Sequence, residues 1–269
     1  MNFKILWNLL NIYDLMIIAM LVLSAYNLQK FSLSYAVPII SIIISAGAID
    51  FIIIYVKEKR KPDGRAGRVF RSLPRSALIS GLILSLILQG PLLFLILVSA
   101  IAILSKHVIK IKNKHIFNPA IFGLFVALFL PVSQSWWGTS NLLLVALLGI
   151  VIVYKLKRFH LALPFLAVHA AVMFVLFSFD VNQLVAHIIS GSLLFFAFYM
   201  MIEPITSPLK MKSSIIFGIL AGVFASILYA VWLPAMLVGA LFFAGLCVPI
   251  LNWKPRVKPA DVPSTNPNW

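Results

Sequence analysis

The sequence predicts an all-α integral membrane protein with about ten transmembrane helices, some of them short or broken. Of its 269 residues, 62% are hydrophobic and only 11% are charged, which excludes an ordinary soluble domain. Apolar runs follow one another along the chain, and basic residues fall in alternate connections between them. Together these observations are typical of a multi-pass membrane protein.

Ten apolar runs are candidates for membrane helices, which need about 20 residues to cross a bilayer. The third and fourth runs are short and are separated by Gln89-Gly90-Pro91. They are therefore expected to be tilted, kinked or partly re-entrant, or to be two parts of one broken helix. The ten runs are 9–29, 33–56, 76–89, 91–105, 117–131, 141–154, 160–178, 183–202, 213–230 and 232–250.

The first run resembles a signal peptide because Lys4 precedes an apolar stretch. That stretch, from Ile12 to Leu28, is too long for a signal peptide, and no clear small-residue cleavage site follows it, so we interpret it as a retained span. The single cysteine, Cys247, lies within an apolar run. It excludes a disulfide framework and a cysteine metal cluster, and we expect it to pack in the core.

The net charge of +15 reflects topology rather than nucleic-acid binding. Counted against the ten runs, all of the 22 Lys and Arg residues except Lys30 fall on one side of the membrane. Because positive residues mark the cytoplasmic side, both termini are predicted to be cytoplasmic, in a multi-pass protein of the plasma membrane. We expect the basic loops to attract anionic lipids.

The chain is predicted to form one polytopic membrane domain over residues 1–252. The longest cytoplasmic connection covers 57–75, where Pro62 and Gly64 favour a turn. Residues 253–269 are polar and proline-rich, which predicts a disordered cytoplasmic tail.

A short internal sequence repeat is relevant to the architecture. Leu78-Ile79-Ser80-Gly81 recurs as Ile188-Ile189-Ser190-Gly191, five runs later. An odd offset reverses the direction of entry into the membrane, as two inverted five-helix halves require, and such folds bind ligands near broken helices. Four small or aliphatic residues also recur by chance in apolar sequence, so both interpretations stay open.

Asn118 is the first candidate site residue, in the polar string 105–120 that interrupts the apolar pattern. Pro119 disfavours a helical conformation at Asn118, whose amide has donors and acceptors suited to the edge of a planar heterocycle. The simpler interpretation makes Asn118 a helix N-cap with Pro119 at the first helical position. The two roles are compatible.

Glu203 is the second candidate, at the start of Glu203-Pro204-Ile205-Thr206-Ser207-Pro208. It follows an apolar run in which Ser192 is the only polar residue, and two prolines hold the next residues out of a helix. Glu203 could accept a hydrogen bond from a ligand N–H group or bind a cation. Alternatively, it is an interfacial carboxylate paired with Lys210 or Lys212.

The remaining polar residues in apolar runs are weaker candidates. Asp50 marks an ion path, because intramembrane carboxylates are costly, or it pairs with the cluster Lys57–Lys61. His107, His169 and His187 are expected in packing or interfacial roles, and no histidine pair has i, i+4 spacing, so we predict no metal site. The sequence also has no Walker loop, dinucleotide-binding turn or nucleophile elbow, so any redox chemistry requires a cofactor.

The two polar strings carry a family resemblance. Lys-His followed by Phe-Asn-Pro-Ala, and then Ser-Gly, Ala-Phe-Tyr-Met and Glu-Pro-Ile-Thr-Ser-Pro, resembles the NqrB/RnfD membrane subunits over about Ser76 to Asn252. These subunits belong to the sodium-pumping NADH:quinone oxidoreductase and the Rnf ferredoxin:NAD oxidoreductase. The resemblance implies ten spans in two inverted halves. It also implies a riboflavin or non-covalent FMN site at Asn118, at Glu203 in place of the usual Asp, and at His115.

One departure concerns the second flavin of that family, an FMN joined to a threonine of an S-x-A-T motif in a long external loop. The corresponding loop here, 132–141, is short and lacks the motif, so we do not expect covalent FMN. Thr139 is the only threonine in this loop and would be the attachment residue only if FMN were covalent. Trp136 and Trp137 are expected to be interfacial anchors.

The sequence therefore predicts a flavin-binding, non-autonomous subunit of a redox chain. It would pass electrons between a cytoplasmic NAD(P)H or ferredoxin oxidoreductase, with a flavin or iron–sulfur group, and a membrane acceptor, alongside other membrane subunits. Na⁺ or H⁺ movement would be coupled to this transfer. The alternatives are a transporter or channel for a small solute or a flavin on the same scaffold, and a structural anchor for a soluble reductase.

Overall fold

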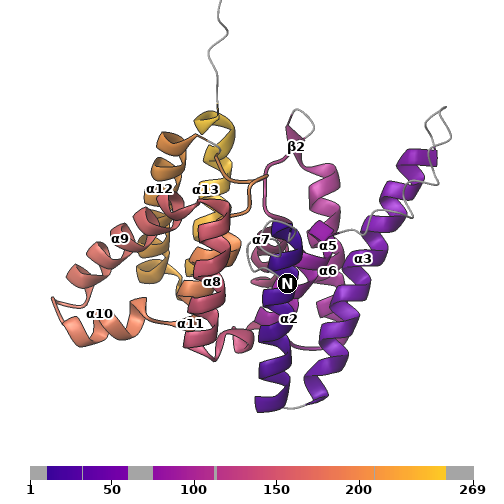
Figure 1. Cartoon of the computed structure of the whole chain (residues 1–269), viewed down its shortest axis with the longest axis horizontal. Coiled ribbons are helices and arrows are strands. Elements are labelled where there is room, and N and C mark those ends of the chain that lie inside the picture. The colour runs from indigo at the N-terminus through magenta and orange to yellow at the C-terminus, as the bar shows by residue number, and fades with distance from the viewer. Residues whose placement is uncertain (1–10, 32, 60–74, 112–113, 209, 253–269) are drawn as a thin grey trace, which may run out of the picture.

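The computed structural model describes residues 11–31, 33–59, 75–111, 114–208 and 210–252, which form a bundle of helices (Figure 1). Many large apolar side chains are exposed on its outside, for example Ile44 at 63% and Leu143 at 68%. An exposed apolar surface of this kind is typical of a protein whose solvent is lipid. The prediction of an all-α membrane protein is confirmed.

Five helices form the first half of the chain as described. Residues Leu33–Tyr35 form a single 3₁₀ turn (η1) before the second of them. The five are α2 (Ile12–Lys30), α3 (Ala36–Lys59), α5 (Arg75–Ile87), α6 (Leu92–Val108) and α7 (Pro119–Ala127).

The second half contains a helix that is broken. Here α10 and α11 are bent by 49° at Ile189 and Ser190, and α11 continues as a π-helical turn, η3 (Phe196–Met200). The other bounds are α8 (Leu142–Leu156), α9 (Phe159–Leu176), α10 (Val181–Ile188), α11 (Gly191–Phe195), α12 (Met211–Val231) and α13 (Met236–Leu251), with 3₁₀ turns η2 (Trp137–Thr139) and η4 (Leu233–Ala235).

A helix therefore occurs in each of the ten predicted runs within the described residues. Five are long and apolar enough to cross a membrane alone, or six if the bent pair is one span, while α5, α6 and α8 are shorter apolar helices. The exact number of crossings stays a prediction. The continuous run expected over 183–202 is corrected to a broken one, because Ser190 accepts a hydrogen bond from the Leu193 N–H group and starts a new helix.

Packing repeats between the two halves with an offset of five predicted runs. In the first half α3 packs on α6, α6 on α7 and α2 on α5, and in the second half α9 packs on α12, α12 on α13 and α8 on α11. This repetition of neighbours is the arrangement that the predicted inverted halves require.

Short antiparallel strand pairs close two of the connections. β1 (Leu88–Gln89) pairs with β4 (Ser133–Gln134), and β2 (Lys110–Ile111) pairs with β3 (Lys114–His115). Between β1 and α6, Gly90 has φ of 155°, a conformation that side chains with a Cβ rarely adopt. This turn separates α5 from α6, so the two are distinct helices rather than one interrupted helix.

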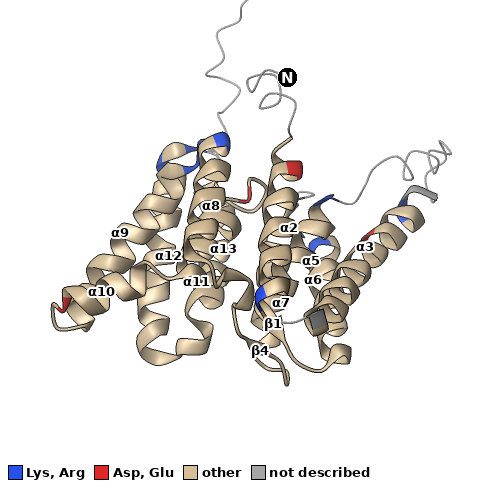
Figure 2. Ribbon diagram, turned by 60° about the horizontal axis from the view of Figure 1, so that its bottom comes forward, with Lys and Arg blue, Asp and Glu red and all other residues tan. Residues whose placement is uncertain are grey.

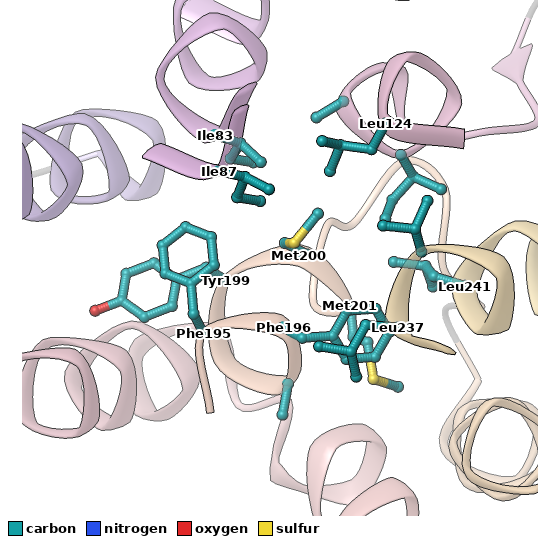
Figure 3. Close-up of a cluster of buried hydrophobic side chains, with 14 of the residues drawn as sticks. Ile83, Ile87, Leu124, Phe195, Phe196, Tyr199, Met200, Met201, Leu237 and Leu241 are labelled. Carbon is teal, nitrogen blue, oxygen red and sulfur yellow. The ribbon is translucent and has the colours of Figure 1, made fainter. Parts of the chain in front are cut away.

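The core lies where the broken helix meets both halves (Figure 3). Figure 3 shows Met200 between Ile83 of α5 and Leu241 of α13, with Phe195 and Tyr199 beside each other on the side away from Leu241. Five of the largest fully buried side chains of the described residues are aromatic, and Tyr199 donates a hydrogen bond to the Val145 carbonyl oxygen at 3.0 Å. The segment that leads into the Glu203 turn is therefore fixed by packing on several helices.

Figure 2 shows that the described Lys and Arg residues gather at one end of the bundle. The exception is at the opposite end, where α2 finishes at Lys30. This distribution agrees with the predicted alternation of charge. The loop 60–74 and the tail 253–269 lie outside the described residues.

Candidate functional site

Asn118 is the N-cap of α7. Its Oδ1 accepts hydrogen bonds from the N–H groups of Ala120 at 2.9 Å and Ile121 at 3.3 Å, and Pro119 is the first residue of the helix. The Asn118 Nδ2 group donates to the Met200 carbonyl oxygen at 3.4 Å. The cap interpretation is confirmed, and the same side chain joins the first polar string to the segment that precedes Glu203.

Glu203 lies in a hydrogen-bonded turn at the end of the broken helix. Thr206 Oγ1 donates to Glu203 Oε2 at 2.9 Å, and Ser207 Oγ donates to the Glu203 carbonyl oxygen at 2.6 Å. Burial raises the pKa of the Glu203 carboxyl to about 7, against the opposing effects of Thr206 and the charge of Lys106. The carboxyl therefore changes its protonation near neutral pH, which is unusual for a glutamate.

Lys106 lies between this turn and His115 in the electrostatic contacts of the site. Lys106 interacts electrostatically with both Glu203 and His115, although its side chain is only 9% exposed. Burial, with the charges of nearby lysines, lowers the pKa of His115 to about 4, and its Nε2 is buried without a hydrogen-bond partner. A neutral imidazole with an unpaired buried nitrogen is suited to a polar ligand.

Arg158 was not singled out from the sequence, because it stands in a basic cluster that topology explains. It is 7% exposed, at the turn between α8 and α9. Its Nη1 donates to the Pro208 carbonyl oxygen at 2.7 Å and to Ser207 Oγ at 3.3 Å. Burial lowers its pKa, and its hydrogen bonds hold the end of the Glu203 turn. No sequence signal separates this arginine from its exposed neighbours.

Asp50 lies away from this turn, in a buried ion cluster between α3 and α6. Lys106 Nζ is 2.8 Å from its Oδ2, and His107 Nε2 is 2.7 Å from its Oδ1. Its ion-pair partner among the described residues is therefore Lys106, and Lys57 of the cluster Lys57–Lys61 also interacts electrostatically with Asp50 and approaches His107 Nδ1 at 3.4 Å. Residues 60 and 61 of that cluster lie outside the described residues. Lys106 links this cluster to the Glu203 turn.

Two histidines that the sequence treats separately lie in contact. His169 Nε2 is 3.0 Å from His187 Nε2, and His169 Nδ1 is 2.9 Å from Ser226 Oγ. The packing role expected for His169 holds, since it is fully buried and stacks on Phe165. Among the described residues no cluster of three or more His, Cys, Asp or Glu side chains is placed to hold a metal ion.

Thr139 lies at the end of the bundle opposite the basic residues. It is 6% exposed, and its Oγ1 donates to the Trp136 carbonyl oxygen at 2.8 Å. A phosphoester at this oxygen would require the loss of that hydrogen bond and the opening of the turn. Trp137 is also buried and donates to the Ser85 carbonyl oxygen, so it is a core residue rather than the interfacial anchor expected.

The residues near Asn118 fit a planar ring in part. Phe117 stacks on Phe242 at 4.5 Å between ring centroids, and Phe242 stacks on Phe125 at 4.0 Å, with interplanar angles of 4° and 5°. These parallel aromatic faces include Phe117, the residue before Asn118, and are of the kind on which a planar ring stacks. A cavity of about 320 Å³ lies elsewhere, beside Tyr35, Gln89 and Trp137.

Known proteins that are similar to this chain align with only part of it. The D subunit of the ion-translocating oxidoreductase complex from Haemophilus influenzae strain PittEE is 25% identical over 139 residues, or 49% of this chain. The corresponding protein of strain PittGG matches equally. The alignment covers 37% of each relative, so the chain spans little more than a third of the length of the curated relatives it matches.

A family model, described as the NQR2, RnfD, RnfE family, matches residues 125–259, which is half of the chain. The matched residues include Glu203 and Arg158, whereas Asn118 and His115 precede them. Helical composition, the charge distribution and the match agree with the resemblance carried by the two polar strings. The chain therefore belongs to the NQR2, RnfD, RnfE family.

Proposed function

We propose that this chain is a membrane subunit of an ion-translocating oxidoreductase complex and that it binds riboflavin or FMN non-covalently. The family and the similarity to the Haemophilus influenzae proteins support the first part. The observation that carries the second is the meeting of the two polar strings, where the Asn118 amide contacts the Met200 backbone just before Glu203. The site is close to basic residues, since Lys106 acts on Glu203 and both Lys106 and Lys110 act on His115.

The side chains at this meeting point supply the groups that the edge of an isoalloxazine ring requires. Glu203 accepts from a ring N–H group when ionised and donates to a ring carbonyl when protonated, and its pKa of about 7 makes both forms accessible. The unpaired His115 Nε2 provides a third polar contact. A bound flavin would supply one- and two-electron transfer, which these side chains do not perform alone.

The partners follow from the same placement. The positive end of the bundle attracts anionic lipid and the acidic surface of a cytoplasmic reductase with a flavin or iron–sulfur group. Other membrane subunits would cover part of the exposed apolar surface. Asp50 would serve as an ion site only if a passing ion replaced Lys106 or His107 at its carboxylate, so ion coupling requires movement of α6 against α3.

The test is a titration of the purified, detergent-solubilised protein with riboflavin and with FMN, followed by flavin fluorescence quenching. Absorption spectra before and after acid precipitation report whether flavin purified with the protein is covalently attached. Asn118→Asp keeps a capping oxygen but loses the amide donor, whereas Asn118→Ala loses both. Glu203→Gln removes the charge, and Asp14→Asn, at an exposed carboxylate paired with Arg75, is the matched control.

We expect Asn118→Asp and Glu203→Gln to weaken flavin binding at least about tenfold, which corresponds to the loss of one hydrogen bond to a charged or buried group. Asp14→Asn should bind flavin normally. Loss of binding in Asn118→Ala with normal binding in Asn118→Asp would show that the residue is a cap alone. No flavin binding by the folded protein would contradict the proposal and favour a small-solute transporter on the same scaffold.

A further inference from the structure

A polar chain crosses the interior of the second half, among helices that are otherwise apolar at this level. It consists of His187 at the end of α10, His169 in the middle of α9, and Ser226 toward the end of α12. His169 and Ser226 are buried, whereas His187 is partly exposed. Ionisable side chains within a membrane domain are costly, so a connected pair of them indicates a function.

The directions of the hydrogen bonds follow from the last member of the chain. Ser226 Oγ donates its proton to the Gly222 carbonyl oxygen at 2.9 Å, so it accepts from His169 Nδ1. With its proton on Nδ1, the neutral His169 ring has a lone pair on Nε2. His187 Nε2 must then donate to His169 Nε2 across 3.0 Å, since two lone pairs would repel.

The surroundings of the pair are aromatic. His169 stacks on Phe165, with 5.9 Å between centroids and an interplanar angle of 3°. Phe177 and Tyr229 meet the His187 ring edge to face, at 5.6 Å and 5.2 Å.

Tyr229 is in ring contact with the pair. It is one of the titratable or charged residues that α9, α10, η3, α12 and their adjoining turns contribute in the described residues. The others are Lys157, Arg158, His160, Asp180, Tyr199, Glu203, Lys210 and Lys212.

A comparable polar link joins the related helices of the first half. There Asp50 of α3 pairs with Lys106 of α6, near the basic end of the bundle. In the second half His169 of α9 bonds to Ser226 of α12, toward the opposite end. The inverted repeat of packing thus places one ionisable link toward each end of the membrane domain.

We propose that His169 and His187 form a proton-binding site, in which one added proton is shared between the two imidazoles. The proton enters at His187 Nδ1 on the partly exposed ring, and the Nε2 proton of His187 passes to His169 Nε2. His187 is then a neutral ring protonated at Nδ1, and His169 is an imidazolium that still donates to Ser226. The site is independent of flavin binding.

The site lies at the bend of the broken helix. His187 is in the last turn of α10, and the bend of 49° follows it before α11 and η3 lead to Glu203. A charge on the pair therefore strengthens the bond that ties α10 to α9. Only α11 and η3 separate this bend from the Glu203 turn.

The experiment uses ¹⁵N-histidine-labelled full-length protein in lipid nanodiscs and solid-state NMR, which distinguishes protonated from unprotonated ring nitrogens. His169→Gln, His187→Asn and His160→Gln assign the signals, and His160→Gln is the control on the same helix. At about pH 8 we expect His169 protonated on Nδ1 and His187 on Nε2. Between about pH 8 and about pH 5 the two rings should change together, with one common midpoint.

Two variants separate this proposal from simple packing. In His187→Asn the ring of His169 should stay neutral over the same range. In Ser226→Ala His169 should keep its proton on Nδ1, because the Gly222 carbonyl oxygen remains as an acceptor. Separate midpoints, no titration down to about pH 5, or an unchanged His169 in His187→Asn would overturn the proposal. So would equimolar Zn²⁺ that shifts both Nε2 signals at about pH 8, since the pair would then be a metal site.

Discussion

Replacement of Asp50 by Asn tests how the membrane domain balances its buried charge. The Asp50 carboxylate contacts Lys106 Nζ at 2.8 Å and His107 Nε2 at 2.7 Å, and the side chains of the ion pair are 3% and 9% exposed. Asn keeps the size of the side chain but leaves the Lys106 ammonium without its counter-ion. The variant therefore isolates the electrostatic contribution.

The expected loss follows from burial. Breaking a buried ion pair on one side costs about 3–5 kcal/mol in the free energy of unfolding, because a desolvated charge remains. Asp14 provides the comparison, since its pair with Arg75 at 3.0 Å has side chains 37% and 47% exposed. An exposed pair of that kind contributes about 0–1 kcal/mol, so Asp14→Asn should be nearly neutral.

Reversible unfolding in mixed detergent micelles, followed by circular dichroism at fixed pH and salt, measures both losses. The double variant Asp50→Asn/Lys106→Met removes both charges and should recover part of the stability lost in Asp50→Asn. If Asp50→Asn were as harmless as Asp14→Asn, or if the double variant were less stable than both single variants combined, the assigned ion pair would be wrong.

Three further predictions concern the Glu203 turn and the helix contacts. Because the pKa of Glu203 is raised from 4.5 to about 7, the folded state binds this proton more tightly than the unfolded chain. The stability of the wild type should therefore fall by about 1–3 kcal/mol as the pH rises from 4.5 to about 7. Unfolding curves at several pH values should show this slope in the wild type and not in Glu203→Gln. Arg158→Met should lower stability by about 1.5–3 kcal/mol in the same assay, because the buried Pro208 carbonyl loses a charged donor, and a loss below about 0.5 kcal/mol would contradict the hydrogen bond. Gly218→Ala should destabilise the protein by about 1–3 kcal/mol, because the added Cβ would meet a backbone carbonyl of α9. Gly47→Ala, which has open space around it, should stabilise the protein by about 0.5–1 kcal/mol. Stability changes of the same sign in both variants would refute this contrast.

Hydropathy and charge predicted the helical segments because lipid imposes them locally. A run of apolar residues must form a helix in a bilayer, and Lys and Arg mark its cytoplasmic end whatever the tertiary structure. Pro119 likewise indicated the start of α7 from local geometry alone. These features depend on neighbouring residues in the sequence, and the structure agrees with them.

Contacts between distant segments were not predictable in the same way. At the break before α11, Gly191 lies so close to the Thr139 carbonyl oxygen that a Cβ would collide with it, and hydropathy contains no signal for that contact. Arg158 and Lys106 were counted as surface charges, although both are buried. The His169–His187 pair joins residues on different helices, so i, i+4 spacing could not reveal it.

The π-helical turn Phe196–Met200 has a consequence for sequence comparison within the family. A π turn normally arises from one residue inserted into an α-helix, and each residue of an α-helix advances by about 100°. The insertion therefore rotates everything after it, including the start of the Glu203 turn, relative to Phe195. A relative that lacks one residue in this stretch would direct its acidic residue toward a different helix, even if its Glu-Pro or Asp-Pro motif were identical. Gaps aligned across these five positions therefore carry more information about the site than the identity of its carboxylate.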